Sequence, residues 1–526
     1  MAEYLPVIKS QTFFGSARTG IIQLNDQEIS FPALIEPGIF NFADGTFKLF
    51  NEKFEPRTEE LRGRQLNIFE SENFFVPSVD PSIILRSKRM TSAIMELKSK
   101  LGYEKLLYVP GISDPYIVPQ LYLLGMDIFD TIQASMEGQK GIEYSMMGRL
   151  HTQSNSVESN KGFLREILKL LSLGTSGLTL MELVERWNIS PKGNEVVRRI
   201  YSDFYGDFEK SYPRFANSVL ASSTISSGRP EIQRFNSYIT GEYRKPSEPS
   251  IALFIPCSAR KPYSTSKSHI ALSNALGSLK KNVHEIILTS PLSIVPRELE
   301  EVYPAGFYDI SVIGEWYEDE KKALKVSIDE FLANNSYKEK IFFLHKDMEF
   351  IEETLPKGAR FIEWKRNVAD PFEELLKVLR ELAMQQAVKR DFTKEKLKAM
   401  AIYQFGSWIK PYLEELKVTR MFNQLMLTGT RGNPFFIFNP ELGKMTIHRN
   451  AANLFLDNNR YLIEIDDFKP TANIYAMGIK NCSKDIRQED EIVIHHGGEI
   501  RGTGISKMSW EIMMKSRKGI AVKVRG

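Results

Sequence analysis

A continuous apolar run at residues 251–255, IALFI, constrains the fold of this chain more than any other stretch. A strand that is apolar at every position is buried on both faces, as in a parallel sheet covered by helices. Pro256 ends the run, and residues 269–282 follow with the spacing of an amphipathic helix, namely Leu272, Ala275, Leu276 and Leu279. Further strand-like segments lie at 283–291, 309–314, 340–345 and 359–364. This alternation predicts a small doubly wound, Rossmann-like α/β domain.

The regions that flank this domain have patterns of their own. Upstream, the strand, helix and strand of one βαβ unit are predicted at 105–111, 114–125 and 126–132. Residues 163–215 have a strongly helical pattern, and Ser, Gly and Pro are frequent between 222 and 249, which indicates a domain boundary. Downstream, a long helical stretch is predicted at 371–409. The short apolar segments after Asn433 predict a compact β-rich terminus.

Length and composition exclude several classes of protein. A chain of 526 residues is too long for one hydrophobic core, so about two to four domains are expected. Hydrophobic and charged fractions of 42% and 26% are those of a globular protein. The sequence shows no export signal and no apolar stretch long enough to cross a bilayer. Because Cys257 and Cys482 are the two cysteines, a disulfide framework and a cysteine-rich zinc site are excluded. We therefore expect a cytoplasmic protein with no membrane segment and no metal site.

Positive charge is concentrated at the C-terminus, although the net charge of the chain is only +3. Against Glu511 alone, the last 26 residues carry Arg501, Lys507, Lys515, Arg517, Lys518, Lys523 and Arg525. In the final segment these charges alternate with Ile520, Val522 and Val524, which predicts a strand with one buried face. We expect the basic side chains to lie at the surface, where they would favour contacts with phosphates.

The segment after Pro256, CSARKPYSTSKSH, places several reactive side chains at the carboxyl end of a predicted strand, where open α/β sheets bind ligands. Cys257 is a nucleophile if Arg260, Lys261 or the N-terminus of the next helix lowers the pKa of its thiol. His269 could transfer a proton, Tyr263 and the serines could orient a polar substrate, and Ser266 or Ser268 could cap the helix. The alternative is a buried packing cysteine beside a serine-rich turn.

The spacing Pro-Cys-x3-Lys-Pro-Tyr-x2-Ser-x2-His resembles the signature of the archaeosine synthases, archaeal tRNA-modifying relatives of the tRNA-guanine transglycosylases. Residues 289–316 also resemble the catalytic domain of that family. On this resemblance we assign a catalytic group and a substrate-binding group. The catalytic group is Cys257, Lys261, Tyr263, Ser266 and His269, and the substrate-binding group is Pro256, Ser258, Ser290 and Asp130.

The N-terminal part resembles a transglycosylase barrel over residues 110–134, and Asp130 falls where that family has its nucleophilic aspartate. The Pro-Thr-Arg of bacterial members is absent, with Gln133-Ala134-Ser135 in that region, and residues 151–160 hold no counterpart of the zinc-binding cysteines. The resemblance therefore implies a degenerate (β/α) barrel that no longer exchanges bases. Asp130 is then a relic or a group that contacts the base.

The C-terminal part resembles the extra domains of the archaeal transglycosylase. The segments 403–406 and 431–455 are similar to its small linking domain, and residues 460–526 are similar to a PUA domain, a module that binds RNA. The predicted RNA-binding residues are Arg501, Lys507, Arg517, Lys518, Lys523 and Arg525. We thus predict a multidomain α/β plus β architecture: a barrel at 1–243, a catalytic α/β domain at 244–390, a linking α+β domain at 391–457 and a PUA β-barrel at 458–526.

The resemblance implies a tRNA substrate that carries 7-cyano-7-deazaguanine in its D-loop. An amine attacks the nitrile to give an amidine, with free L-lysine as the expected donor through its ε-amino group and glutamine or ammonia as alternatives. A radical-SAM partner protein would complete archaeosine, and no cofactor is expected. Attack is either direct, which we favour slightly, or through a thioimidate on Cys257. Two other functions stay open, an inactive tRNA-binding paralogue and a base-exchanging transglycosylase, and a homodimer is one alternative for the oligomeric state.

Overall fold

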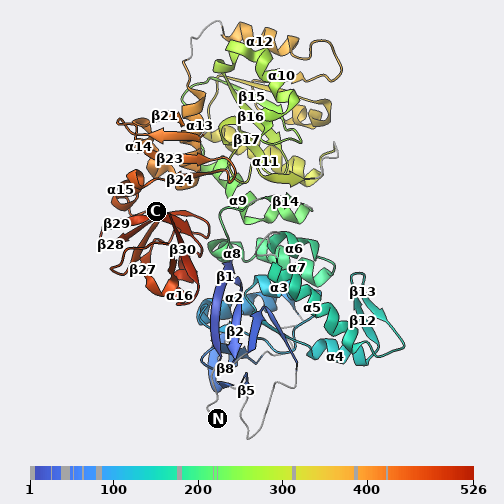
Figure 1. Ribbon diagram of the computed structural model, residues 1–526. Helices are drawn as coiled ribbons and strands as arrows, with labels where there is room; N and C mark the ends of the chain where they lie inside the picture. The colour runs from blue at the N-terminus through green and yellow to red at the C-terminus, as the bar shows by residue number, and fades with distance from the viewer. Residues whose placement is uncertain are drawn as a thin grey trace. The chain divides into compact units, whose positions relative to one another are not determined.

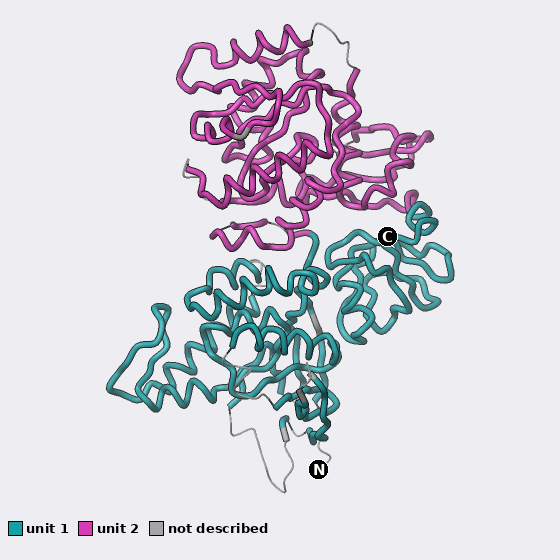
Figure 2. The backbone as a smooth tube through the Cα atoms, turned by 180° about the vertical axis from the view of Figure 1, so that it is seen from behind, with its two compact units in different colours: residues 1–214, 452–526 teal, residues 215–451 magenta. Residues whose placement is uncertain are grey.

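The computed structural model describes residues 6–24, 27–36, 48–50, 52–61, 64–78, 86–173, 180–216, 218–221, 223–310, 315–383, 389–421 and 424–525. The chain forms two compact units, one of residues 1–214 with 452–526 and one of residues 215–451 (Figure 2). Over the described ranges, no helix combines the length and the apolar character needed to span a membrane.

The second unit contains a five-stranded sheet in the order β17-β16-β15-β19-β20 (Figure 1). Its strands are β15 (Ile251–Pro256), β16 (Val283–Thr289), β17 (Ser293–Pro296), β19 (Glu339–Leu344) and β20 (Ala359–Glu363). All are parallel except β17, which pairs antiparallel with β16. Every residue of β15 and β16 is buried, as the continuous apolar run predicts.

The order of connections places the carboxyl end of β15 at a topological switch point. Helix α10 (Lys267–Leu276) leads from β15 to β16, which is the neighbour of β15 on one side in the sheet. Helix α11 (Glu318–Asn334) leads to β19, which is its neighbour on the other side. Ser266 begins α10 as its N-cap, and Gly277 ends it with a φ of +49°, a conformation that glycine adopts without strain. Ligands of open α/β sheets bind at such switch points.

A separate parallel pair joins β14 (Val219–Ala221) to β18 (Tyr308–Ile310). The strand predicted at 309–314 thus begins one residue earlier and pairs outside the five-stranded sheet, while residues 311–314 lie outside the described residues. The segment 222–249 is also more ordered than its composition indicates. It contains α9 (Pro230–Ser237), whose Ile232 and Phe235 are fully buried, and the compact units divide before it, at Arg214.

The rest of the second unit combines helices with a four-stranded antiparallel meander. The helices are α12 (Glu373–Ala383), α13 (Phe392–Phe405) and α14 (Lys410–Glu414), and the strands are β21 (Lys417–Met421), β22 (Gln424–Thr428), β23 (Pro434–Asn439) and β24 (Lys444–Ile447). The buried Gln404 amide joins α13 to β24, because it donates to the Met445 carbonyl at 2.8 Å and accepts from the Met445 N–H at 2.7 Å.

The first unit begins with two antiparallel sheets and a run of parallel strands. One antiparallel sheet consists of β1 (Val7–Phe14), β2 (Ala17–Leu24) and β3 (Gln27–Phe31). In a second sheet, antiparallel pairing joins β7 (Glu55–Leu61), β8 (Arg64–Glu70) and β9 (Phe74–Pro77). Parallel contacts link β9, β10 (Leu106–Leu107), β11 (Ile128–Asp130) and β4 (Ala33–Ile35), with a single bridge between β10 and β11 at Tyr108 and Ile128. Helices α2 (Ser87–Leu101) and α3 (Val118–Leu123) connect these strands, so the predicted βαβ unit is confirmed.

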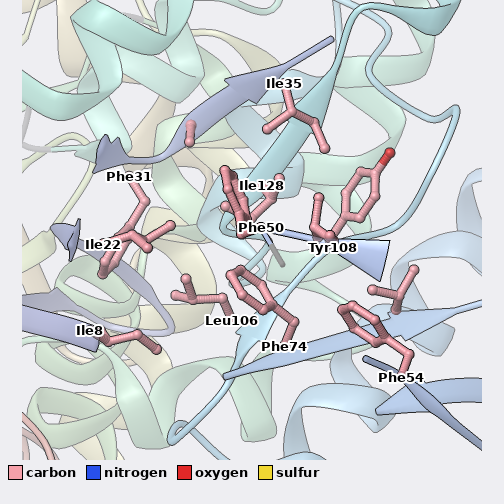
Figure 3. Packing of buried hydrophobic residues seen from close by; sticks show 13 residues of the cluster. Ile8, Ile22, Phe31, Ile35, Phe50, Phe54, Phe74, Leu106, Tyr108 and Ile128 are labelled. Atoms are coloured by element: carbon pink, nitrogen blue, oxygen red, sulfur yellow. The ribbon is translucent and has the colours of Figure 1, made fainter. Parts of the chain in front are cut away.

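Aliphatic and aromatic side chains together form the core between these sheets. The rings of Phe50 and Phe74 stack with their centroids 5.5 Å apart, and Leu106 and Ile128 pack beside them (Figure 3). The parallel strands form part of a barrel-like wall among the described residues. The complete transglycosylase-like barrel stays a prediction.

Helices occupy the remainder of this region, as the pattern at 163–215 predicts. They are α5 (Val157–Leu173), α6 (Leu180–Arg186), α7 (Pro191–Tyr201) and α8 (Tyr205–Ser211). Between β11 and α5 the chain forms α4 (Ile132–Gln139) and a hairpin of β12 (Ile142–Ser145) and β13 (Gly148–His151).

After α15 (Ala452–Asp457), the C-terminal residues form a six-stranded sheet in the order β26-β30-β29-β28-β25-β27. Its strands are β25 (Leu462–Ile465), β26 (Asn473–Tyr475), β27 (Ile479–Cys482), β28 (Glu491–His496), β29 (Glu499–Ser506) and β30 (Ile520–Arg525), with α16 (Trp510–Lys515) before β30. Gly504 is required here, because a Cβ atom would lie 2.7 Å from the Lys523 carbonyl oxygen. The predicted β-rich terminus is confirmed.

The two segments of the first unit are joined by buried polar contacts. The Gly15 N–H donates to the Gln488 side chain at 3.1 Å, and Arg214 forms an ion pair with the buried Asp490 at 3.0 Å. Residues from the two ends of the chain therefore complete one compact unit.

Candidate active site

Cys257 extends the hydrogen bonding of β15 by one residue, because its N–H donates to the Leu288 carbonyl of β16 at 3.1 Å. Burial raises the pKa of the Cys257 thiol, and a hydrogen bond from Thr289 and the charge of Lys261 only partly oppose this rise. A nucleophilic Cys257 required a lowered pKa, through Arg260, Lys261 or the helix N-terminus, and the rise instead agrees with the alternative of a packing cysteine. Arg260 is exposed, and the low dielectric around the sulfur outweighs the nearby charge. The thiol is therefore protonated at neutral pH.

Three hydroxyl groups form a chain beside this cysteine. The Tyr308 hydroxyl lies 2.5 Å from Thr289 Oγ1 and 2.6 Å from the Tyr263 hydroxyl. Thr289 ends β16, Tyr308 belongs to β18, and Tyr263 lies in a short 3-10 helix, Tyr263–Thr265. Burial raises the pKa of both phenols above their usual value, so both are neutral. Such a chain can pass a proton between its ends.

Lys261 covers the face of Tyr308, with Nζ 3.9 Å from the ring centroid. Burial lowers the pKa of the Lys261 ammonium, although Cys257 and Asp309 oppose this effect. A lysine that releases its proton more readily is a candidate general base. The cation–π contact fixes the amine beside the hydroxyl chain.

His269 is held at both ring nitrogens. Nε2 lies 3.0 Å from the Pro256 carbonyl oxygen, and Nδ1 lies 2.8 Å from the Arg297 guanidinium. Because arginine only donates, Nδ1 must accept and the ring proton is assigned to Nε2, which donates to Pro256. Burial and then the Arg297 charge lower the pKa of His269 to about 4. This geometry favours a positioning role for His269 over the proton transfer that the sequence suggested.

Arg297 also organises the loop in front of α10. Its guanidinium donates to Glu285 and to Glu300, each at 2.8 Å, and Glu300 accepts the Ser264 N–H at 2.9 Å. Ser266 caps α10 by accepting the His269 N–H at 3.3 Å. Sequence reasoning did not single out Thr289, Arg297, Glu300 or Tyr308. All four lie within the segment 289–316, whose resemblance to a catalytic domain was the available signal.

A cavity of about 390 Å³ adjoins the hydroxyl chain, and Thr289 belongs to both. The other lining residues are Ala221, Ser223, Thr224, Ser227, Ser290, Pro291, Ser293, Ile310, Glu315, Trp316, Tyr317, Asp319, Glu320 and Ala323. Ser290, predicted to bind substrate, is thus in the wall, where its hydroxyl donates to Glu320 at 2.5 Å. Ser258 is in the loop after Cys257, and its hydroxyl donates to the Arg260 carbonyl at 3.0 Å.

Asp130 belongs to the first unit and is fully buried at the end of β11. Its carboxylate accepts from the Tyr108 hydroxyl at 3.0 Å, from the Gly111 N–H at 2.6 Å and from the Ile132 N–H at 3.0 Å. Burial raises the pKa of Asp130, although these donors oppose the rise. The contacts favour a structural role in the turn after the strand. Within the described ranges, no group of three or more His, Cys, Asp or Glu side chains could hold a metal ion.

The six predicted RNA-binding residues differ in their availability. Arg501 pairs with Asp467 at 2.9 Å, Lys507 pairs with Glu489 at 2.6 Å, and Arg525 pairs with the buried Glu491. Lys518 is half-buried and donates to Asn73 at 3.3 Å, so it does not lie at the open surface as expected. Arg517 and Lys523 are exposed, and the side chain of Arg517 keeps 87% of its accessible area.

Two family models match parts of this chain. A family model described as a domain of unknown function (DUF5591) matches residues 232–381, and a PUA domain model matches residues 467–526. The archaeosine synthase subunit alpha of Thermoplasma acidophilum is 38% identical over 520 residues, which cover 99% of this chain and 100% of the relative. This chain belongs to the archaeosine synthase family.

Other relatives of this archaeosine synthase family member are more distant. The archaeosine synthase subunit alpha of Methanosarcina acetivorans is 29% identical over 84% of this chain and 77% of the relative. The tRNA-guanine(15) transglycosylase of Methanococcus maripaludis is 21% identical over 84% of this chain and 68% of the relative. The DUF5591 match contains β15, α10 and the side chains of Cys257, Lys261, Tyr263, Thr289 and Tyr308.

Proposed function

We propose that this protein adds an amine to the nitrile carbon of 7-cyano-7-deazaguanine in tRNA and so forms an amidine. The observation that carries the proposal is the cluster of Cys257, Lys261 and the Thr289–Tyr308–Tyr263 hydroxyl chain at the switch point of the sheet, next to a cavity. Family membership over the full chain and the C-terminal PUA match support a tRNA substrate. Sites of this kind combine a pocket with groups of shifted pKa.

The proposed step needs no oxidant or reductant. A bond forms between the amine nitrogen and the nitrile carbon, one π bond of the nitrile breaks, and the nitrile nitrogen gains a proton while the amine loses one. Neutral Lys261 is suited to accept a proton from the donor ammonium, because burial lowers the pKa of Lys261. The hydroxyl chain is suited to donate a proton to the nitrile nitrogen, with Thr289 at its cavity end.

The state of Cys257 favours direct addition of the amine. A thiol whose pKa is raised by burial holds little of the thiolate that attacks nitriles. In direct addition the sulfur contributes to the wall of the site and needs no deprotonation. A thioimidate intermediate on Cys257 is the alternative.

In the proposed reaction the donor is L-lysine, which adds through its ε-amino group, and a radical-SAM partner completes archaeosine from the adduct. The Thermoplasma relative is named a subunit alpha, which supports the existence of a second protein. Glutamine-derived or free ammonia is the alternative donor. Arg517 and Lys523 are the most accessible of the proposed tRNA contacts.

The test is a reaction of the full chain with tRNA that carries the nitrile base and with isotopically labelled lysine, followed by mass spectrometry of the nucleosides. We expect a labelled adduct, and Lys261→Met should reduce its rate about a hundredfold through loss of the proton acceptor. Lys267→Met is the matched control, because Lys267 is an exposed lysine of the same motif.

Two results would refute the proposal. Tight tRNA binding with no adduct from lysine, glutamine or ammonium would assign the chain to the inactive tRNA-binding alternative. Exchange of labelled guanine into tRNA would assign it to the base-exchanging alternative.

A further inference from the structure

The cavity beside Thr289 has a strongly negative lining. Glu315, Asp319 and Glu320 contribute carboxylates, and none of its lining residues is lysine or arginine. Glu320 is occupied, because it accepts from Ser290 at 2.5 Å and from the Tyr317 N–H at 2.9 Å. Among the described residues, none forms an ion pair with Glu315 or Asp319, and both side chains are exposed at the rim. Two carboxylates are therefore available to a cation.

The hydroxyl of a largely buried serine in the cavity wall points independently to a ligand. Ser293 lines the cavity and is only 7% exposed, yet no described residue forms a hydrogen bond with its hydroxyl. A hydroxyl of the cavity wall that has no protein partner is free to bond a ligand or water in the cavity. Trp316 and Tyr317 lie at the rim, where aromatic faces attract a cation. The cavity thus offers charge outside and hydrogen bonding inside.

We propose that this cavity binds the amine donor and selects an amine that carries a second cationic group. The inference rests on the proposed function and adds the site and the charge pattern of the donor. The second ammonium lies between Glu315 and Asp319, and the reacting amine lies inside, near Thr289. No cofactor or additional reactant is needed, since the cavity only binds and positions the donor.

The two ends of the cavity suit the two amines differently. The carboxylates of the rim favour a charged ammonium, which holds the donor in place. At the inner end, Thr289 leads to Tyr308, whose ring is covered by Lys261 Nζ at 3.9 Å. A buried setting favours the neutral form of the inner amine, which is the form that attacks a nitrile, and neutral Lys261 is suited to accept the proton that this amine loses. A donor with two amines separated along a chain can satisfy both conditions.

The same charge pattern disfavours tRNA as the occupant. A nucleotide would bring phosphates toward the carboxylates of Glu315 and Asp319 with no basic residue in the lining to offset the repulsion. The nitrile base must therefore approach the hydroxyl chain from outside this cavity.

Isothermal titration of the full chain tests the proposal with three probes: L-lysine, 1,5-diaminopentane and 6-aminohexanoate, which lacks the second amine. We expect lysine and diaminopentane to bind and to compete, with diaminopentane at least as tight because it lacks the carboxylate of lysine, and 6-aminohexanoate to bind more weakly by about tenfold or more. The double variant Glu315→Gln/Asp319→Asn should weaken lysine binding roughly tenfold, as two exposed ion pairs would. Asp329→Asn is the matched control, because Asp329 is exposed on the same helix α11 and does not line the cavity.

Kinetic measurement separates failure of this inference from failure of the proposed function. In the double variant, the KM for lysine should rise about tenfold while tRNA affinity stays unchanged. Adduct formation with an unchanged KM for lysine would overturn the cavity assignment and leave the function intact. Lysine binding that depends on Glu315 and Asp319, without any adduct, would support the cavity assignment and refute the proposed function. Absence of saturable lysine binding to the wild type, with or without the nitrile tRNA, would also overturn the inference.

Discussion

Cys257 shows how burial decides the chemistry of a side chain that sequence alone leaves ambiguous. Because the pKa of its thiol is raised, we expect Cys257→Ala to slow amidine formation by less than about tenfold, whereas loss of a covalent nucleophile costs far more. Single-turnover rates would measure this difference. In parallel, the protein is incubated with nitrile tRNA and no amine, and the mass of the Cys257 peptide is measured by mass spectrometry. A thioimidate on that peptide would overturn direct addition.

Lys261 predicts a pH dependence. Its pKa is lowered from 10.5, and its neutral form is the one that accepts a proton, so kcat at saturating lysine should rise with pH through the lowered pKa and then level off. In Lys261→Met the rate should be low and this rise should disappear. A profile that is the same in the variant and the wild type would show that the donor amine, and not Lys261, produces the rise.

His269 predicts a link between pH and stability. Its pKa in the folded protein is about 4, below the ordinary value of 6.5, so the unfolded chain binds the proton first as the pH falls. The contribution of neutral His269 to stability is fully present above pH 6.5 and is lost as the pH falls through 4. The free energy of unfolding should fall by on the order of 3 kcal/mol. Denaturant unfolding between pH 4 and 7 measures it, and His269→Gln should flatten the slope. An NMR titration midpoint near 6.5 for His269 would contradict the buried, arginine-bound ring.

At the scale of elements, β30 and the residues just before it carry both exposed cations and structural ones. Arg517→Ala with Lys523→Ala should weaken tRNA binding and reduce the slope of log affinity against log salt by about two units. Lys377→Ala, an exposed lysine on α12, is the control. Unchanged salt dependence would argue against RNA binding by these two side chains.

Arg525 should behave differently from those two residues. Its guanidinium pairs with Glu491, whose side chain is fully buried, so Arg525→Ala removes an ion pair from a buried carboxylate. We expect a loss of about 2 kcal/mol in the free energy of unfolding, measured by denaturant titration. An unchanged free energy of unfolding, together with weaker tRNA binding, would place Arg525 among the RNA contacts instead.

Local pattern predicted the elements of the catalytic region better than their partners. The apolar run and the Ser266 cap indicated β15 and α10, because burial and capping depend on neighbours in sequence. The pairing of β14 with β18 brings Tyr308 against Thr289 from a separate sheet. No periodicity within 308–310 indicates that partner, so the hydroxyl chain could not be predicted from the sequence. The sequence likewise left open whether the Cys257 thiol has a lowered or a raised pKa, since burial is a tertiary property.

At the scale of the whole molecule, the chemistry is proposed to belong to the second unit. Asp130→Ala in the first unit should therefore leave amidine formation largely intact. The same change should cost about 1–3 kcal/mol of stability, because the Tyr108 hydroxyl and the Gly111 and Ile132 N–H groups lose their acceptor. Nucleoside mass spectrometry and thermal unfolding measure the two effects. Complete loss of turnover with normal stability and normal tRNA affinity would place Asp130 in the active site.

The joining of residues 1–214 with 452–526 has a consequence for the order of events on the ribosome. Gly15 and Arg214 find their partners Gln488 and Asp490 only after the whole of residues 215–451 has been synthesised. Domains generally fold as units while the chain emerges, so the inserted unit can fold first, whereas the N-terminal segment waits with its contact surface uncovered. A nascent chain stalled before residue 452 should accordingly hold a protease-resistant central fragment and a protease-sensitive beginning.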